Sequence, residues 1–306
     1  LEVNDRTMKS VGYLAFINCS NVKVSGIKLD EDYYAGIKVS GIKLDRNWQG
    51  LLLAFTSDTE VRNLRVYSNY YGIHLVHSND ITIMNTTLTN IHFNIQLVGC
   101  YNVIIANNEF RFKYYTDGVD IKYSRYITVI SNHFSEQFVG IHLFSSEYNY
   151  IIGNTVEDGY IGFSGENFLH SNTITLNNFI DNNIQTYVFT GISSNKWDDG
   201  CDGNYWDDYR GKDSNGDGIG DTPYVIKRDE NNDNCPLMKP YVADSEIMGD
   251  VNGDGIVDIF DVVRMAAVIN SQPGDSNWNE VADINNDYVV SIFDIIIVVV
   301  NFGRNL

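Results

Sequence analysis

Residues 250–261 place oxygen-bearing side chains at the spacing of a calcium-binding loop. The candidate ligands stand at loop positions 1, 3, 5, 7, 9 and 12: Asp250, Asn252, Asp254, Ile256, Asp258 and Asp261. Position 7 contributes its backbone carbonyl, and Asp261 replaces the glutamate usual at position 12. Gly255 permits the sharp turn at position 6. The pattern predicts a Ca²⁺ site.

A second loop of the same kind begins 33 residues later. Its candidate ligands are Asp283, Asn285, Asp287, Val289, Ser291 and Asp294. Tyr288 stands where the motif has glycine, so its backbone must adopt a left-handed conformation that is unfavourable for a bulky side chain. We therefore expect a weaker or distorted Ca²⁺ site.

A third acidic segment lies further towards the N-terminus. Asp213, Asn215 and Asp217 occupy alternate positions, Gly218 allows a sharp turn, and Asp221 closes the loop. Hard cations prefer such oxygen ligands, so the segment predicts another Ca²⁺ loop. A turn held by its own Asp and Asn side chains is the alternative.

Asp120 and His142 are the candidate catalytic residues. They occupy the same place in two similar segments, Gly118-Val119-Asp120-Ile121 and Gly140-Ile141-His142-Leu143. A carboxylate beside a histidine can act as a general base or bind a metal. The alternative is a solvated polar face without chemistry.

These two segments belong to a repeat that runs through most of the chain. Gly72-Ile73-His74-Leu75 and Asn94-Ile95-Gln96-Leu97 are earlier copies, and successive copies are 22 to 24 residues apart. A large apolar residue recurs at similar steps, at Val66, Leu88, Phe110, Phe134, Val156 and Phe179. Short β-branched strands separated by Gly, Asn, Ser and Asp predict coils of three strands that stack as a parallel β-helix.

The corners of the coils carry a recurrent asparagine. Asn63, Asn85, Asn107, Asn132, Asn154 and Asn177 fall within a residue of the same corner. Asparagine tolerates the left-handed backbone of such corners and can bond to its neighbour in the next coil, so we expect a structural ladder. A separate irregularity is the segment VSGIKLD, which occurs at residues 24–30 and again at 39–45, less than one coil later.

Residues 10–240 resemble the NosD-like right-handed parallel β-helices of the carbohydrate-binding and sugar-hydrolase type. The resemblance implies an all-β fold with a β-helix over residues 1–195. Residues 196–243 resemble the Asp-rich segment that ends such β-helices. The resemblance to NosD-like β-helices does not imply a particular activity, because no catalytic motif of the family is present.

Residues 244–306 resemble a type I dockerin, a calcium-binding module of two loops, each followed by a helix. The partner-binding residues at loop positions 10 and 11 are then Ile259, Phe260, Ile292 and Phe293. The resemblance implies docking to a cohesin-like domain, or to another copy of the chain. Packing between the two helices is the alternative role for these four residues. Residues 295–300 are all β-branched and by themselves favour a strand.

Composition and charge restrict the possible partners. The net charge of −19 argues against binding nucleic acid. The longest apolar run, residues 295–300, is too short to span a membrane. Since the chain begins at Leu1, we expect a trimmed, exported protein. Cys201 and Cys235 flank an acidic segment and are expected to form a disulfide.

These features favour an extracellular or cell-surface protein that is structural or adhesive and assembles through its calcium-binding module, as a filament or surface layer. A polysaccharide is a further candidate ligand. The alternative function is a secreted polysaccharide lyase or glycoside hydrolase carried by a dockerin. Copper-site maturation has less support, because the sequence shows no Met- or His-rich cluster.

Overall fold

The computed structural model describes residues 2–4, 14–17, 23–25, 37–40, 43–45, 49–89, 91–111, 116–189, 193–200, 202–242, 249–252, 257, 259–284 and 288–301. The chain divides into two compact units, Leu1–Tyr241 and Val242–Leu306.

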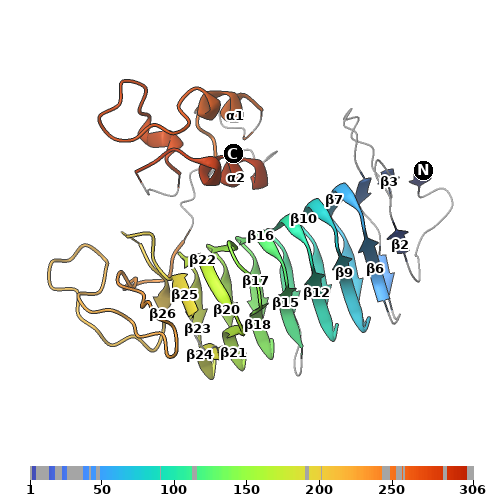
Figure 1. Ribbon diagram of the computed structural model, residues 1–306, viewed down its shortest axis with the longest axis horizontal. Helices are drawn as coiled ribbons and strands as arrows, with labels where there is room; N and C mark the ends of the chain where they lie inside the picture. Colours follow the sequence, from blue (N-terminus) through green and yellow to red (C-terminus); the bar gives the residue numbers. More distant parts are fainter. Residues whose placement is uncertain are drawn as a thin grey trace. The chain divides into compact units, whose positions relative to one another are not determined.

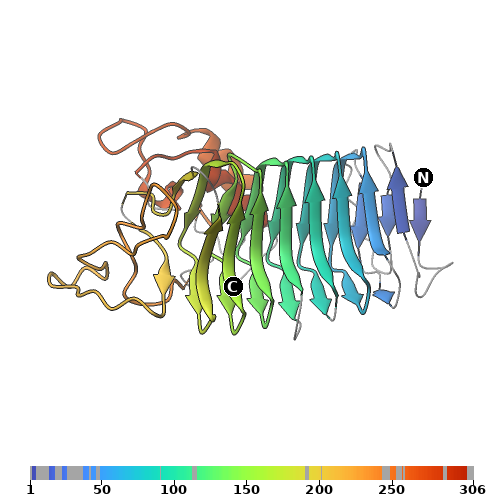
Figure 2. The ribbon, with the colours of Figure 1, turned by 60° about the horizontal axis from the view of Figure 1, so that its bottom comes forward.

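The first unit is a parallel β-helix whose walls are three sheets, as the sequence predicts (Figure 1; Figure 2). Sheet A contains, in spatial order, β1 (Glu2–Asn4), β3 (Lys23–Ser25), β4 (Ile37–Ser40), β7 (Ser57–Arg62), β10 (Asn79–Met84), β13 (Tyr101–Ala106), β16 (Arg125–Ile130), β19 (Tyr150–Ile152), β22 (Leu169–Thr175) and β25 (Ser193–Lys196). Sheet B contains β26 (Tyr205–Trp206), β23 (Asn178–Ile180), β20 (Thr155–Glu157), β17 (His133–Ser135), β14 (Glu109–Arg111), β11 (Thr87–Thr89), β8 (Arg65–Tyr67) and β5 (Lys43–Asp45). Sheet C contains β2 (Leu14–Ile17), β6 (Gln49–Ala54), β9 (Tyr71–Val76), β12 (Phe93–Val98), β15 (Asp117–Lys122), β18 (Val139–Phe144), β21 (Ile161–Glu166) and β24 (Ile184–Phe189).

The inward side chains of successive coils stack in register. In sheet C, Ile95 lies opposite Val119 and Leu97 opposite Ile121, and all four are fully buried. The large apolar residues of sheet B stack in the same way, and the Phe110 and Phe134 rings lie 4.4 Å apart. Burial of this continuous apolar column is the main driving force for stacking the coils.

The corner asparagines divide two tasks between adjacent positions. Asn63, Asn85 and Asn107 take the left-handed backbone, with φ of 54°, 52° and 53°. In those coils the ladder runs through the next residue, as at Thr86 and Asn108. The prediction that a single asparagine does both is therefore wrong, and in the later coils Ser131, Gly153 and Leu176 take the left-handed backbone before the ladder asparagine.

From Asn108 onwards the ladder is continuous and buried. Asn154 Oδ1 accepts hydrogen bonds from the backbone N–H and from Nδ2 of Asn132, both at 3.0 Å. Asn177 Oδ1 accepts hydrogen bonds from the backbone N–H and Nδ2 of Asn154, at 3.0 and 2.9 Å. Asn204 Oδ1 accepts the same two bonds from Asn177, at 3.1 and 2.9 Å. Each amide thereby satisfies a backbone donor that the strand ladders leave unpaired at the corner.

The repeated VSGIKLD segment pairs partly with itself. Val24 of β3 lies opposite Val39 of β4, so 15 residues separate these two strands, whereas the other neighbouring strands of sheet A are 21 to 24 residues apart. The coil between these copies is therefore shorter than the others.

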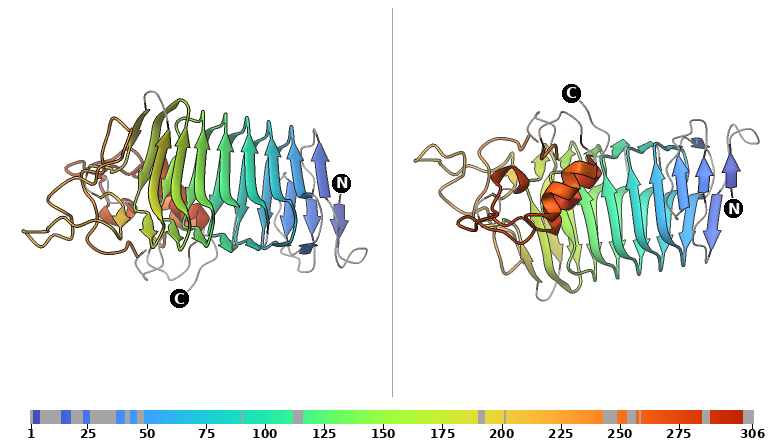
Figure 3. Two further views of the ribbon diagram at one scale, coloured as in Figure 1. Left: turned by 90° about the horizontal axis from the view of Figure 1, so that it is seen from below. Right: turned by 90° about the horizontal axis from the view of Figure 1, so that it is seen from above.

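The second unit contains the helices α1 (Ile259–Ala266) and α2 (Ile292–Val300), with a short 3₁₀ helix η1 (Glu280–Ala282) (Figure 3). Its core includes Val257, Met265, Val290 and Val298. The β-branched residues 295–300 lie in α2, so the strand favoured by propensity is not formed. Packing of the apolar face of α2 outweighs its unfavourable helix propensity.

Replacing Asn154 with alanine should destabilise the β-helix by about 3 kcal/mol, because it leaves two donors of Asn132 unpaired in the interior. Urea unfolding followed by circular dichroism measures the change. The control is Asn85→Gly, at an exposed left-handed corner residue, which should cost less than about 0.5 kcal/mol. Equal effects of the two substitutions would contradict a stabilising role for the ladder.

Candidate functional site

Asp120 and His142 lie side by side on the outer face of sheet C. They are direct partners between β15 and β18, and His142 Nδ1 lies 3.0 Å from Asp120 Oδ1. The predicted stacking of these two residues is confirmed.

Asp120 is not solvated, in contrast to the expected polar face. Its side chain is 1% exposed, and its Oδ2 accepts hydrogen bonds from Gln96 Nε2 at 2.8 Å and Lys122 Nζ at 2.7 Å. Burial acts to raise the pKa of Asp120, but the bonds from His142, Lys122 and Gln96 outweigh it and hold the pKa below its ordinary value. Asp120 is therefore a clamped carboxylate.

A third member of this cluster, Asp117, is absent from the sequence-based prediction. Asp117, Asp120 and His142 can each bring one ligand atom within 4.8 Å of the other two. Burial, aided by the charge of Asp120, raises the pKa of Asp117 to about 6. The sequence signal that could have identified Asp117 is an acidic residue three positions before Asp120 on the same predicted strand.

The position-12 aspartates of both C-terminal loops are fully buried. Asp261 Oδ1 accepts a hydrogen bond from the Asn252 N–H at 3.0 Å. Asp294 accepts bonds from the N–H groups of Ile284 and Ser291, at 2.8 and 2.7 Å. These two carboxylates close their loops onto the starts of α1 and α2.

The second loop has the strained backbone that its sequence predicts. Tyr288 has φ of 64° and donates its N–H to Asp283 Oδ2 at 2.9 Å. Asp250, Asn252, Asp283, Val289 and Ser291 are described. The remaining predicted ligands, Asp254, Ile256, Asp258, Asn285 and Asp287, lie outside the described residues.

Three of the four predicted partner-binding residues are exposed. The exposed fractions are 53% for Ile259, 63% for Phe260 and 55% for Ile292. These values argue against packing between the helices. The side chain of Phe293 lies outside the described part of the structure.

The acidic loop at residues 213–221 is exposed and folds onto itself. Asp213 accepts hydrogen bonds from the N–H groups of Gly216 and Gly218, at 2.7 and 3.0 Å. Asn215 donates to Asp217 at 2.7 Å, and Asp221 accepts from the Ser214 N–H at 3.0 Å. This is the arrangement of the Asx-rich alternative, and the Ca²⁺ loop stays a prediction.

Two aspartates elsewhere in the Asp-rich segment of residues 196–243 accept the last hydrogen bonds of buried ladders in the β-helix. Asp233 accepts hydrogen bonds from the Asn204 N–H at 2.7 Å and from Trp206 Nε1 at 2.8 Å. Asp229 accepts from Asn195 Nδ2 at 2.8 Å and closes a second ladder through Asn172 and Asn195. Gly203 is required beside Asp233, because a Cβ there would lie 1.9 Å from Asp233 Oδ1.

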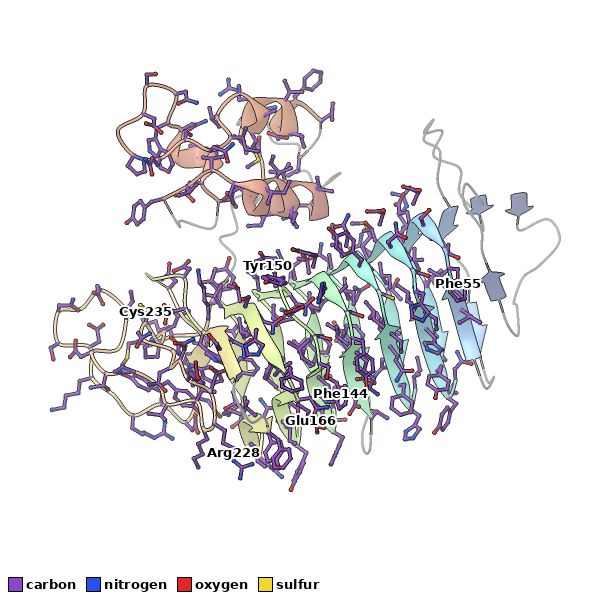
Figure 4. The ribbon with its side chains drawn as sticks, viewed as in Figure 1. Phe55, Phe144, Tyr150, Glu166, Arg228 and Cys235 are labelled. Carbon is purple, nitrogen blue, oxygen red and sulfur yellow. The ribbon has the colours of Figure 1, made fainter. Side chains whose placement is uncertain are left out.

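The predicted disulfide stays a prediction, because Cys201 lies outside the described residues. Cys235 (Figure 4) is half-buried. It donates its N–H to Asp233 Oδ1 at 3.1 Å. Among the described residues, the helices are too short or too polar to cross a membrane.

Comparison with known proteins identifies both units. Residues 8–211 match the family model described as Periplasmic copper-binding protein (NosD), and residues 248–302 match the Dockerin type I domain. The chain is also 32% identical over 116 residues to the Probable ABC transporter binding protein NosD of Stutzerimonas stutzeri. That alignment covers 38% of the chain and 20% of the relative.

The stability contribution of Asp233 should fall as pH rises. Burial raises the pKa of Asp233 to about 6 from the ordinary 3.8, so between these values the folded protein holds a proton that the unfolded chain has released. From about pH 4 to about pH 6.5, the unfolding free energy of the wild type should fall by about 2 kcal/mol relative to Asp233→Asn. Urea unfolding of both proteins across this range measures the difference. A difference independent of pH would contradict the shifted pKa.

Proposed function

Because the chain belongs to the NosD family and carries a type I dockerin domain, we propose that it is an extracellular, non-catalytic β-helix protein, structural or adhesive, that joins an assembly through calcium-dependent docking. The observation that carries this proposal is the exposure of Ile259, Phe260 and Ile292 at equivalent positions of the two loops. Exposed apolar residues on an acidic module are suited to a protein partner.

Calcium would couple directly to this surface. Ile259 and Phe260 immediately precede the buried Asp261, and Ile292 stands two residues before the buried Asp294. In each loop, the position-12 carboxylate is the expected calcium ligand that lies within the first turn of the following helix. Ion binding would therefore order the same segment that presents the apolar side chains.

Type I dockerins typically bind cohesin domains, and a cohesin-like domain is the partner that this surface fits first. A second copy of the chain is the other candidate partner. A contact between different surfaces of two copies would leave each new end free, so growth would give a filament or surface layer. The exported location follows from this role, since cohesin–dockerin assemblies are extracellular.

The arrangement around Asp120 supports a non-catalytic role. Both of its oxygens have partners and its side chain is 1% exposed, so a polysaccharide could not reach it. Glycoside hydrolysis needs two carboxylates flanking the bond to be cleaved. A lyase or hydrolase is the second candidate function, favoured by the proximity of Asp117 to Asp120 and His142. Assays of a polysaccharide panel for new reducing ends and unsaturated uronates separate the two, and cleavage lost in His142→Ala would establish the enzyme.

The copper named in the family description can be tested against the donors of this chain. Asp117, Asp120 and His142 supply carboxylate oxygens and imidazole nitrogens without sulfur. Cu(I) prefers thiolate and thioether ligands, whereas divalent copper accepts nitrogen and oxygen. The group thus fits Cu²⁺ and does not fit Cu⁺.

Removal of Ca²⁺ should unfold the C-terminal module and spare the β-helix. Residues 244–306 contain 11 acidic residues against two arginines, and the carboxylates of Asp261 and Asp294 are buried within this acidic module. Hydrogen exchange of the full chain should show loss of protection in α1 and α2 with chelator, while β12 and β15 stay protected. Unchanged protection of α1 and α2 would contradict structural calcium.

An acidic residue in the apolar surface should abolish docking. In Ca²⁺, titration calorimetry with a type I cohesin domain should show binding to the wild type and at least about 100-fold weaker binding to Phe260→Asp, a loss of about 3 kcal/mol. The control is Val281→Asp, because Val281 is 61% exposed outside α1 and α2.

Sedimentation of the same proteins without cohesin tests the second copy as partner. Binding that is equal in Phe260→Asp and Val281→Asp would contradict the proposed surface. Absence of both cohesin binding and self-association in the wild type would contradict the proposed function.

A further inference from the structure

The geometry points to a binding site for a divalent transition-metal ion, with Zn²⁺ as the simplest occupant, formed by Asp117, Asp120 and His142. The site lies on the outer face of sheet C, on the adjacent strands β15 and β18. One ligand atom from each residue lies within 4.8 Å of the other two. It is independent of the dockerin module and of the proposed docking function.

The separation of the nearest pair suits two ligands of one ion. His142 Nδ1 and Asp120 Oδ1 are 3.0 Å apart. Zinc binds imidazole nitrogen and carboxylate oxygen at about 2.0–2.2 Å in tetrahedral geometry, so neighbouring ligands of one ion lie about 3.4 Å apart, which these two atoms reach by separating a few tenths of an ångström. Asp117 supplies the third ligand from the same strand as Asp120, and water would complete the coordination.

The surrounding groups hold the ligands as an outer shell does in metal sites. Gln96 and Lys122 both bind Asp120 Oδ2, which directs Oδ1 towards His142. His142 Nε2 is buried without a hydrogen-bond partner, and the carboxylate atom Glu166 Oε1 lies 3.9 Å from it. Glu166 stands on β21 opposite Phe144 of β18 (Figure 4). A histidine that binds metal through one nitrogen usually donates the other N–H to a carboxylate, and Glu166 is placed for that role.

A second histidine shows what an ordinary ion-paired arrangement looks like. His133 Nδ1 lies 3.1 Å from Glu109, and its Nε2 lies 2.8 Å from Glu157. Both ring nitrogens are engaged with different carboxylates on opposite sides, and the side chain is 37% exposed. An ion bound to one ring nitrogen of His133 could reach only one of the two glutamates, because the other glutamate contacts the other nitrogen. His133 therefore provides the matched control for His142.

The test is a Zn²⁺ titration of the full, Ca²⁺-saturated chain by calorimetry. The wild type and His133→Gln should bind one more Zn²⁺ than His142→Gln and Asp117→Asn, or bind it at least about tenfold more tightly. Circular dichroism establishes that each variant is folded. If His142→Gln does not fold, the half-buried Asp117 decides the result through Asp117→Asn.

Nitrogen-15 spectra of histidine-labelled protein locate the ion. Zn²⁺ should shift the Nδ1 signal of His142 and leave that of His133 in place. A parallel titration with Cu²⁺ should show tighter binding at the same site, following the order of divalent metals. Equal Zn²⁺ binding by all four proteins, or a His142 signal that does not move, would overturn the inference.

Discussion

The β-helix depends on the requirement that every coil present its backbone groups in register to the next. At the corners the strand ladders leave donors in the interior, and unpaired buried donors cost about 1–3 kcal/mol each. Asn108, Asn132, Asn154, Asn177 and Asn204 meet this requirement with their side chains. A left-handed residue stands before each of the first four and turns the chain, as at Asn107 with φ of 53°. Together these constraints set the step between coils, and that step places Asp120 against His142.

The same requirement gives the acidic segment a structural task. A ladder must end somewhere, and its last amide would otherwise lack an acceptor in the interior. Asp233 accepts a hydrogen bond from Asn204 at the end of one ladder, and Asp229 accepts one from Asn195 at the end of the other. The segment also covers the last coil, whose open edge would otherwise be free to pair with another chain. These two aspartates therefore have a structural role separate from calcium.

Periodicity in the sequence predicts which residues stack, but it says little about features that depend on closure in three dimensions. Spacing alone pairs Asp120 with His142, because a position within a strand is a local property. Burial of Asp120 depends on Gln96 and Lys122, which approach from the neighbouring strand and from the same strand.

Two further features escape local sequence patterns for related reasons. The dockerin resemblance implies a helix after the second loop, but local preference at residues 295–300 does not, since packing of Val298 into the module core outweighs that preference. The roles of Asp229 and Asp233 cannot be assigned either, because no repeat marks a residue that occurs only at the end of a stack.

Calcium and a protein partner should bind the C-terminal module as one coupled system. The direct measurement is the affinity of the full chain for Ca²⁺ with and without a saturating cohesin domain. Coupling is reciprocal, so if Ca²⁺ strengthens partner binding, the partner must strengthen Ca²⁺ binding by the same factor. We predict at least about a tenfold gain in Ca²⁺ affinity, equivalent to about 1.4 kcal/mol. Identical Ca²⁺ affinity in the presence and absence of bound cohesin would contradict this coupling.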